Sequence, residues 1–269
     1  MRTVVFNQKG GVGKSTITVN LAAVGASRGR RTLVVDLDPS GNASRYLLGA
    51  EADTARTGAA DLFEQALKFS VRERPATDYV AQTPFKALHL VAADARLDEM
   101  QAKLESRYKI YKLREALDEL AEIYDDIWID TPPALNFFSR SALIAARTCV
   151  IPFDCDEFSR HALYGLMASV DEIRADHNPA LEIGGIVVNQ FQPRANLPQR
   201  TVRELVDEGL PVLQPYLSAS VKIRESHERA MPMAWLDPRH KLAEEFEALY
   251  ERLAGPDAKP GKGKGKTKR

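Results

Sequence analysis

The chain has 269 residues, of which 44% are hydrophobic and 28% charged, and its formal net charge is zero. This length suits one large α/β domain and is short for two, and the balanced charge indicates no particular partner. Two cysteines are too few for a disulfide framework, no apolar run reaches the ~18 residues of a membrane span, and the N-terminus lacks the apolar segment of a signal peptide. We therefore expect a cytoplasmic protein.

Short segments rich in β-branched residues alternate along the chain with amphipathic segments. The predicted strands lie at residues 3–6, 32–37, 88–93, 126–130, 148–153, 183–189 and 211–217, and the predicted helices at 14–29, 110–124, 158–174, 197–209 and 240–253. Strands that are apolar on both faces, with helices between them, are typical of a mostly parallel sheet covered on both sides. The predicted fold is therefore three-layer α/β.

The predicted domain spans residues 1–254 and is followed by a tail at residues 255–269. The tail is rich in glycine, proline and lysine and has no apolar face to bury, so we predict it to be disordered. Residues 50–86 are mixed in character and have no clear periodicity, and they support no prediction.

The segment NQKGGVGKST, residues 7–16, lies between the first predicted strand and the first predicted helix. Its glycines allow several backbone N–H groups to face one anion, and the helix N-terminus adds its free amides. Lys14 is predicted to reach the β- and γ-phosphates of a nucleotide, and Ser15 to offer its hydroxyl to Mg²⁺. The plain Walker A pattern has glycine where this chain has Gln8. The residues predicted to contact nucleotide are Lys9, Gly10, Gly11, Val12, Gly13, Lys14, Ser15 and Thr16.

Aspartates stand at the ends of two predicted strands. Asp36 and Asp38 occur in DLDPSGN, and Asp130 ends IWID. In an open parallel sheet, ligands bind at the carboxyl ends of the strands. Asp38 is therefore predicted to hold a water molecule or a magnesium ligand near the γ-phosphate. Asp130 takes the place of a Walker B carboxylate, so Ser15, Asp38 and Asp130 are the predicted metal-site residues.

The segments KGGVGKST, DLDPSGN and DTPP resemble those of the ParA/MinD family of deviant Walker A ATPases, and within it the ParA partition proteins. Residues 155–166 and 221–226 resemble the family more loosely, and the similarity runs from residue 2 to about residue 253. The resemblance implies a P-loop NTPase fold and slow ATP hydrolysis with Mg²⁺. Many relatives have glutamine where this chain has Ser40, so the role of that side chain stays open.

The resemblance also assigns roles to single residues. It implies that Lys9 reaches across a dimer interface to the partner's ATP and that Asp38 positions the attacking water, so Lys9, Lys14 and Asp38 are the predicted catalytic residues. It further implies that Asn189 and Pro215 contact adenine.

Three functions within this family differ in the surface that they require. A membrane-binding MinD-type protein needs a C-terminal amphipathic helix, which residues 254–269 do not provide. Iron–sulfur relatives share a cluster through two cysteines per subunit, whereas we interpret Cys149 and Cys155 as structural thiols. DNA binding remains: Arg194 and Lys222 match positions that are basic in relatives and contact DNA phosphates. The nearby candidates are Arg224 and Arg200.

The sequence therefore predicts a cytoplasmic, nucleoid-associated ATPase that forms an ATP-bound homodimer and binds DNA without sequence preference. With no helix-turn-helix ahead of the glycine loop, sequence-specific repression is not expected. A ParB-like or adaptor protein would stimulate hydrolysis, and the cycle would distribute plasmid, chromosome or other cargo. Two alternatives stay open: a positioning ATPase for flagella, chemotaxis arrays or carboxysomes, and an ATP-dependent amidoligase of the dethiobiotin or cobyrinate type.

Overall fold

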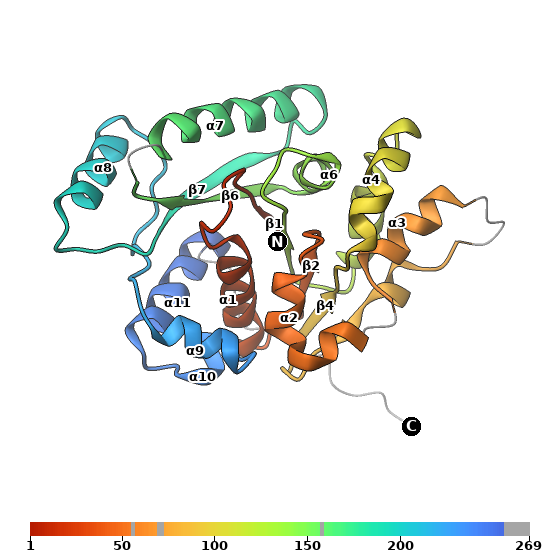
Figure 1. The fold of residues 1–269 in the computed structure, drawn as a ribbon, viewed down its shortest axis with the longest axis horizontal. Helices are drawn as coiled ribbons and strands as arrows, with labels where there is room; N and C mark the ends of the chain where they lie inside the picture. Colours follow the sequence, from red (N-terminus) through yellow and green to blue (C-terminus); the bar gives the residue numbers. More distant parts are fainter. Residues whose placement is uncertain (55–56, 69–72, 157–158, 256–269) are drawn as a thin grey trace.

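The computed structural model of the protein describes residues 1–54, 57–68, 73–156 and 159–255. In these residues one sheet of seven strands runs in the order β3-β4-β2-β5-β1-β6-β7 (Figure 1). All neighbouring strands pair in parallel except β3, which is antiparallel to β4. The strands are β1 (Arg2–Val5), β2 (Thr32–Asp36), β3 (Ala81–Gln82), β4 (Leu88–Val91), β5 (Asp126–Asp130), β6 (Thr148–Asp154) and β7 (Glu182–Asn189).

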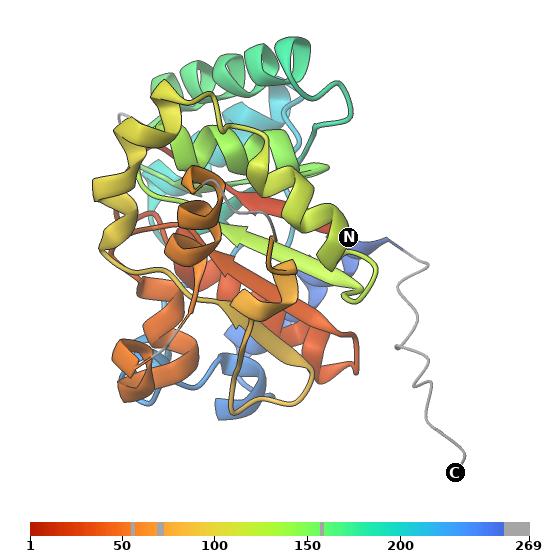
Figure 2. The same ribbon diagram turned by 90° about the vertical axis from the view of Figure 1, so that its right-hand side faces the viewer.

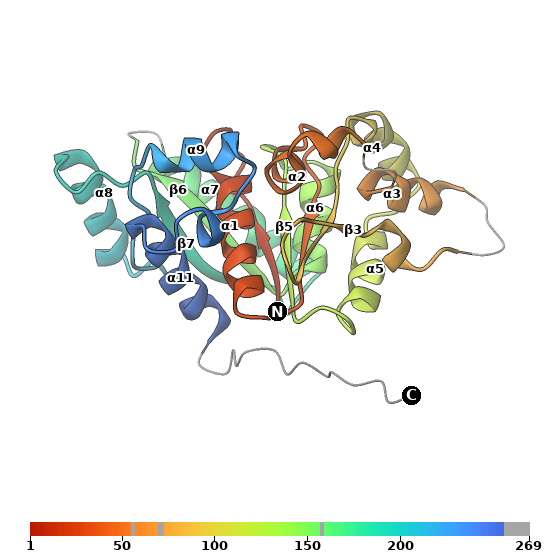
Figure 3. The same cartoon turned by 90° about the horizontal axis from the view of Figure 1, so that it is seen from below.

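Helices cover both faces of the sheet, which Figure 2 shows between its two helical layers. One face, turned toward the viewer in Figure 3, carries α1 (Lys14–Ser27), α2 (Asn42–Leu48), α9 (Lys222–Glu228), α10 (Met233–Leu236) and α11 (Lys241–Ala254). The other carries α3 (Ala59–Leu67), α4 (Arg96–Ser106), α5 (Lys112–Leu120), α6 (Phe137–Ala145), α7 (Ser159–Asp176) and α8 (Asn196–Asp207). Two short 3-10 helices, η1 (Gly49–Thr54) and η2 (Ala76–Tyr79), complete the described elements. The three-layer fold is confirmed.

The alternation of side chains along each strand builds the two hydrophobic cores. Val4 belongs to the core under α3–α8, and the next residue, Val5, belongs to the core under α1 and α11. Both are completely buried, as expected for a strand whose successive side chains point to opposite faces. In the register, Asp130 at the end of β5 pairs with Val5 and with Asp36. The sheet thereby brings the ends of three central strands together beside the glycine loop.

The predicted strand at residues 211–217 is wrong. This segment runs beside β7 but makes only isolated bridges, Ile186 with Val212 and Phe191 with Ser218. Pro211 and Pro215 have no backbone N–H to donate, so a continuous ladder cannot form. The two-residue strand β3 forms the other edge of the sheet. The sequence pattern predicted neither this strand nor the helices α2, α3, α4, α6, α9 and α10.

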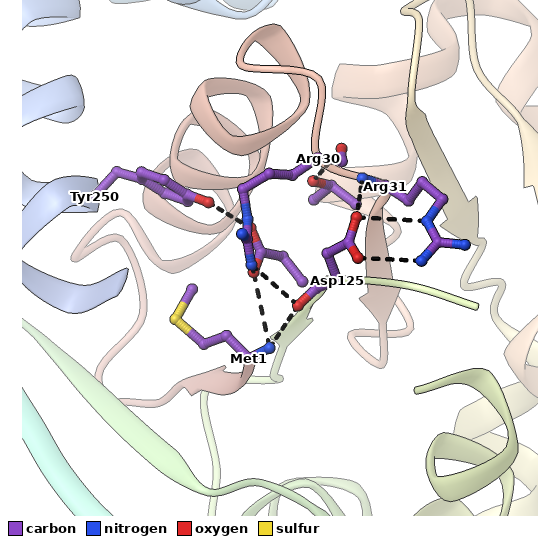
Figure 4. A network of polar contacts seen from close by, with 7 residues as sticks. Met1, Arg30, Arg31, Asp125 and Tyr250 are labelled. Carbon is purple, nitrogen blue, oxygen red and sulfur yellow. Dashed lines mark hydrogen bonds and ion pairs between the residues drawn. The ribbon is translucent and has the colours of Figure 1, made fainter. Parts of the chain in front are cut away.

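A buried polar network fixes the opposite end of the sheet (Figure 4). The Asp126 carboxylate is fully buried and accepts two hydrogen bonds from Arg30, each 2.7 Å long. The Tyr250 hydroxyl of α11 also donates to it, and the Met1 amino group donates to the Asp125 carbonyl at 2.5 Å. Because these groups lie at the amino ends of the strands, away from the glycine loop, the network attaches α11 to the sheet and takes no part in the site.

Three further predictions concern membrane spans, the two cysteines and the C-terminal tail. In the part of the chain that the structure describes, none of the helices is both long and apolar enough to span a bilayer. Cys149 and Cys155 are buried, and burial raises the pKa of each thiol to about 12, which fits structural thiols. Residues 256–269, which hold nearly all of the predicted disordered tail, lie outside the described residues.

Candidate nucleotide-binding site

The glycine loop between β1 and α1 is shaped by two left-handed glycines and one long-range bond. Gly11 and Gly13 have φ angles of 77° and 92°. The Asn189 side-chain amide, from the end of β7, donates to the Val12 carbonyl at 2.9 Å. A Cβ atom added at Gly13 would lie only 2.3 Å from the Asn189 Nδ2 atom. The backbone conformation therefore favours glycine at position 13, and a larger residue there would displace the Asn189 amide.

Lys14 begins α1 and points back into the loop. Its side chain is buried, with only 7% of the residue exposed, and its Nζ donates to the Lys9 carbonyl at 2.9 Å. Burial lowers the pKa of Lys14, while the Asp130 and Asp38 carboxylates act in the opposite direction. A partly desolvated ammonium group attracts an anion more strongly than one in water does. Lys14 is thus placed as the cationic floor of the site.

A pocket of about 540 Å³ opens above the loop. Its walls include three glycines of the glycine loop and the first residues of α1, together with two residues from the loop after β2. These are Gly10, Gly11, Gly13, Lys14, Ser15, Thr16, Asp38 and Ser40. The first turn of α1 lines the pocket, so the free N–H groups and the positive end of the helix dipole point into it. The structure therefore brings the predicted phosphate-binding residues and Asp38 into one cavity, although they come from different strand ends.

Ser40 holds the Asp38 side chain in place. The carboxylate is nearly buried, and its Oδ1 accepts a hydrogen bond from the Ser40 N–H at 3.0 Å and another from the Ser40 hydroxyl at 2.8 Å. These two bonds occupy one oxygen and limit rotation of the carboxylate. Ser40 therefore orients Asp38, which leaves the second Asp38 oxygen available to the pocket.

Asp36, the other aspartate of DLDPSGN, has a structural role. It is completely buried, and it accepts hydrogen bonds from the Ser44 N–H at 2.8 Å, the Ser44 hydroxyl at 2.7 Å and the Asp38 N–H at 3.1 Å. Burial raises the pKa of Asp36 to about 6. The carboxylate fixes the turn that carries Asp38 and the first turn of α2.

Asp130 is a buried carboxylate with an unused oxygen. Burial and the neighbouring Asp36 raise the pKa of Asp130 well above its usual value, and a hydrogen bond with Ser15 opposes this shift. Among the described residues, no group donates to the Asp130 Oδ2 atom. A buried carboxylate beside the Ser15 hydroxyl fits a hydrated magnesium ion, which would satisfy that oxygen. The described residues contain no group of three or more acidic, histidine or cysteine side chains arranged for a metal, so a cation here would need phosphate oxygens as further ligands.

Lys9 lies beside the pocket and faces its own chain. The Lys9 ammonium forms an ion pair with Asp156, two residues after β6, and lies 3.9 Å from an oxygen of Asp154, the last residue of β6. The Lys9 N–H donates to the Asn7 side chain at 2.9 Å. About 40% of the Lys9 side chain is exposed. The structure thus separates the two lysines of the loop, one buried in the pocket and the other at the surface.

The remaining predicted residues gather around the segment from Ser218 to Arg224. A second pocket of about 520 Å³ adjoins the first and is lined by Asn189, Arg224 and much of this segment. A third, of about 510 Å³, is lined by Arg194 and residues 218–220. Lys222 forms an ion pair with Glu225 at 2.8 Å. Pro215 is not among the described residues that line any of these pockets.

Sequence reasoning missed one residue at the mouth of the site. His227, on α9, lines both the first and the second pocket, and its Nε2 atom lies 3.1 Å from the Thr16 hydroxyl. The two residues are 211 positions apart in the chain. A single histidine in a short polar helix gives no local pattern that would indicate this contact.

The chain is similar to known proteins in sequence and in fold. A family model described as an AAA domain matches residues 1–183. The chromosome partitioning protein ParA of Myxococcus xanthus is 34% identical over 257 residues, which cover 94% of this chain and 87% of that protein. The chromosome-partitioning ATPase Soj of Treponema pallidum is 32% identical over 260 residues, which cover 95% of this chain and 98% of that protein.

The solved structures agree with these relatives in fold. A complex of McdA from Cyanothece with ATP matches with a TM-score of 0.81 at 21% identity, over 94% of this chain and 96% of that one. At this level of identity the match shows the fold alone. The family model covers more than half of the chain, and relatives above 30% identity cover nearly all of it. The chain therefore belongs to the family of the chromosome-partitioning ATPases ParA and Soj.

Proposed function

We propose that this protein is an ATP- and Mg²⁺-dependent ATPase that forms a homodimer on ATP, binds DNA without sequence preference and takes part in DNA partition with a ParB-like activator. One observation carries the proposal: a single pocket combines the glycine loop, the Lys14 ammonium and an Asp38 carboxylate held in place by Ser40. The names of relatives such as the Myxococcus xanthus ParA support partition as the purpose of this chemistry.

In the proposed reaction, the loop amides and Lys14 hold the phosphates of ATP. Ser15, Asp38 and Asp130 are the side chains that would hold magnesium, in part through water, and the bound ion would neutralise charge on the phosphate oxygens. Asp38 has one oxygen occupied by Ser40, and the other accepts a hydrogen bond from the attacking water. Hydrolysis depends mainly on this positioning, because phosphoryl transfer requires little covalent chemistry from the protein.

Lys9 is assigned the contact with the partner's ATP that makes dimerisation depend on nucleotide. Its ammonium is partly exposed and paired with Asp154 and Asp156 of its own chain. An exposed ion pair of this kind stabilises its arrangement by only about 0–1 kcal/mol. The triphosphate of a partner's ATP carries more charge than these carboxylates, so Lys9 transfers to it when two ATP-bound copies meet.

The DNA surface is assigned to Arg194, Lys222 and Arg224. Arg194 and Arg224 are exposed. Arg224 lines the pocket next to the glycine loop, Arg194 lines a neighbouring pocket with residues 218–220, and Lys222 is the first residue of α9. Two copies facing each other through their P-loops double this set of cations, so the dimer binds DNA more tightly than one copy does. Contacts of this type read phosphates and lose affinity steeply as salt rises.

DNA co-sedimentation tests the proposal directly. The protein is mixed with DNA in the presence of ATP, ADP or no nucleotide, across a series of salt concentrations, and its oligomeric state is measured in parallel by analytical ultracentrifugation. We expect DNA binding only with ATP, weakening with salt, together with a doubled mass. Arg194→Glu should abolish DNA binding but not dimerisation.

Arg252→Glu provides the matched control, because Arg252 is exposed near the far end of α11, whereas Lys241 at the start of α11 lines the pocket with Arg194. This variant should bind DNA as the wild type does. An unchanged mass with ATP would refute the proposed dimer. A doubled mass without DNA binding would refute the proposed DNA surface and, with it, DNA partition.

A further inference from the structure

His227 joins α9 to the first turn of the helix that follows the P-loop. Its Nε2 atom lies 3.1 Å from the Thr16 hydroxyl, and its ring meets the Tyr46 ring edge-on, with centroids 4.5 Å apart and an interplanar angle of 88°. Tyr46 lies on α2, directly after the loop that holds Asp38. One imidazole thus contacts both helices that carry the walls of the phosphate pocket.

The residue before His227 makes a second, buried connection to the same helices. The Ser226 hydroxyl donates to the Met231 carbonyl at 2.6 Å, so its proton is used and Tyr46 must donate in the hydrogen bond between the two hydroxyls. Tyr46 in turn accepts from the Asn20 side chain of α1 at 3.1 Å. Ser226 and Tyr46 are both buried. This chain of bonds holds the base of α9 in place and leaves His227 as the contact that faces the pocket.

The Thr16 hydroxyl has one proton, and this limits how it can bond. If Thr16 donates to His227, it has no proton left for another acceptor; if it donates to a phosphate oxygen, it can only accept from His227. The imidazole must then present an N–H at Nε2. A phosphate that accepts from Thr16 would therefore fix the direction of the bond, with His227 as its donor.

We propose that His227 is a positioning residue that couples nucleotide binding to α9: when Thr16 donates to a phosphate of the nucleotide, His227 donates to Thr16 and fixes α9 in the DNA-binding arrangement. The proposal rests on the proposed function for the identity of the two ligands. α9 carries Lys222 and Arg224, which belong to the proposed DNA surface. The phosphate pocket is thus connected to this surface by the hydrogen bond between Thr16 and His227 and by the segment of α9 from Lys222 to His227.

The charges around the imidazole make the donor role of His227 sensitive to pH. The charged side chains that line the two pockets with His227 are Lys14 of α1, Arg45 of α2, Arg224 of α9 and Asp38. The ring is exposed on its outer side, and the burial of its inner side lowers the pKa of His227. Phosphates beside these cations favour the protonated ring, so the pKa rises on binding. Nucleotide affinity should therefore increase as pH falls from about 8 to about 6.

Two substitutions separate the bond from the packing. His227→Phe keeps an aromatic ring against Tyr46 and removes the hydrogen bond to Thr16. His227→Gln keeps an N–H donor near the position of Nε2 and cannot titrate in this range. Because His227 is exposed, both variants should fold, which circular dichroism and thermal melting of the nucleotide-free proteins would verify.

The first measurement is DNA co-sedimentation with and without a non-hydrolysable ATP analogue. In the wild type the analogue raises DNA affinity; in His227→Phe we expect this enhancement to fall by about tenfold, within the usual range of coupling between sites. His227→Gln should restore it to within about threefold of the wild type. The pH dependence of analogue binding, followed by fluorescence, should flatten in both variants. Full enhancement in His227→Phe would overturn the proposal.

The second measurement does not depend on DNA. The NMR signals of the His227 ring, identified by their loss in His227→Gln, report its pKa with and without the ATP analogue. A rise in this pKa on binding supports the link between Thr16 and His227 even if the wild type binds no DNA, in which case the DNA part of the proposed function fails alone. An unchanged pKa on saturation with the analogue overturns the link itself.

Discussion

The bond between Asn189 and the P-loop yields a prediction that separates two roles for this residue. The Asn189 side chain donates to the Val12 carbonyl at 2.9 Å and fills the space where a Cβ of Gly13 would lie. The resemblance to the family predicts instead that Asn189 contacts adenine. If Asn189 braces the loop, Asn189→Ala loses one neutral hydrogen bond, about 1 kcal/mol. This corresponds to about fivefold weaker nucleotide binding.

The base of the nucleotide distinguishes the two roles. A brace on the loop acts before any base is recognised, so Asn189→Ala should weaken ATP and GTP binding by the same factor. An adenine contact would weaken ATP binding alone and reduce the preference for ATP over GTP. The assay is equilibrium titration of fluorescent ATP and GTP analogues against the wild type and the variant, with guanidinium denaturation of the nucleotide-free proteins as a check on stability.

Gly13→Ala provides the matched perturbation of the same contact. Its φ of 92° is unfavourable for alanine by about 1–2 kcal/mol, and its methyl group would displace the Asn189 amide. Because both single changes break the same bond, the double variant Gly13→Ala/Asn189→Ala should lose less than the sum of the two. Strict additivity, or an ATP preference that falls in Asn189→Ala, would refute the brace.

Three further changes test the pocket and the fold. Lys14→Ala should abolish ATP binding, and retained affinity in a fluorescence titration would contradict its place under the phosphates. Asp38→Ala should stop turnover while ATP binding persists. Ser40→Ala removes the hydroxyl that orients the Asp38 carboxylate, so it should lower turnover by about tenfold in a phosphate-release assay. A normal rate in Ser40→Ala would exclude the orienting role. Asp126→Ala should lower the free energy of unfolding by about 3–5 kcal/mol, because it removes a completely buried carboxylate that accepts from the half-buried Arg30 and from the buried Tyr250 hydroxyl. Asp118→Ala, from an exposed ion pair, should cost about 0–1 kcal/mol in the same urea denaturation.

The central part of the fold could be predicted because its signals are local. Strands β1, β2, β4, β5, β6 and β7 each coincide with a short β-branched segment, and the prediction differs from the structure by two residues or fewer at each end. The segment at residues 211–217 failed because its apolar content resembles a strand, while its prolines deny it a hydrogen-bond ladder. The two-residue β3 and the short helices α2, α9 and α10 are too brief for any period to appear.

The same difference between local and long-range signals applies to the residues of the candidate site. Residues within one loop, such as Lys14 and Ser15, could be predicted because the chemistry of a phosphate cradle requires them next to each other. Asn189 contacts Val12 across 177 positions, and His227 contacts Thr16 across 211. Such contacts depend on which strand ends the sheet places together, and no periodicity in the sequence contains that information.

The two lysines of the P-loop differ most in what surrounds them, and this bears on how the proposed dimer would be controlled. Lys14 is buried and lies near the Asp130 and Asp38 carboxylates of its own chain, so we assign it to its own pocket. Lys9 is partly exposed and held by surface carboxylates, Asp156 among them, that compete weakly with a triphosphate. A lysine with no such partners would repel the facing lysine of a second copy at all times. In the proposed dimer, a Lys9 neutralised by its own chain would allow two copies to approach, and a nucleotide in the facing pocket would offer it a stronger partner.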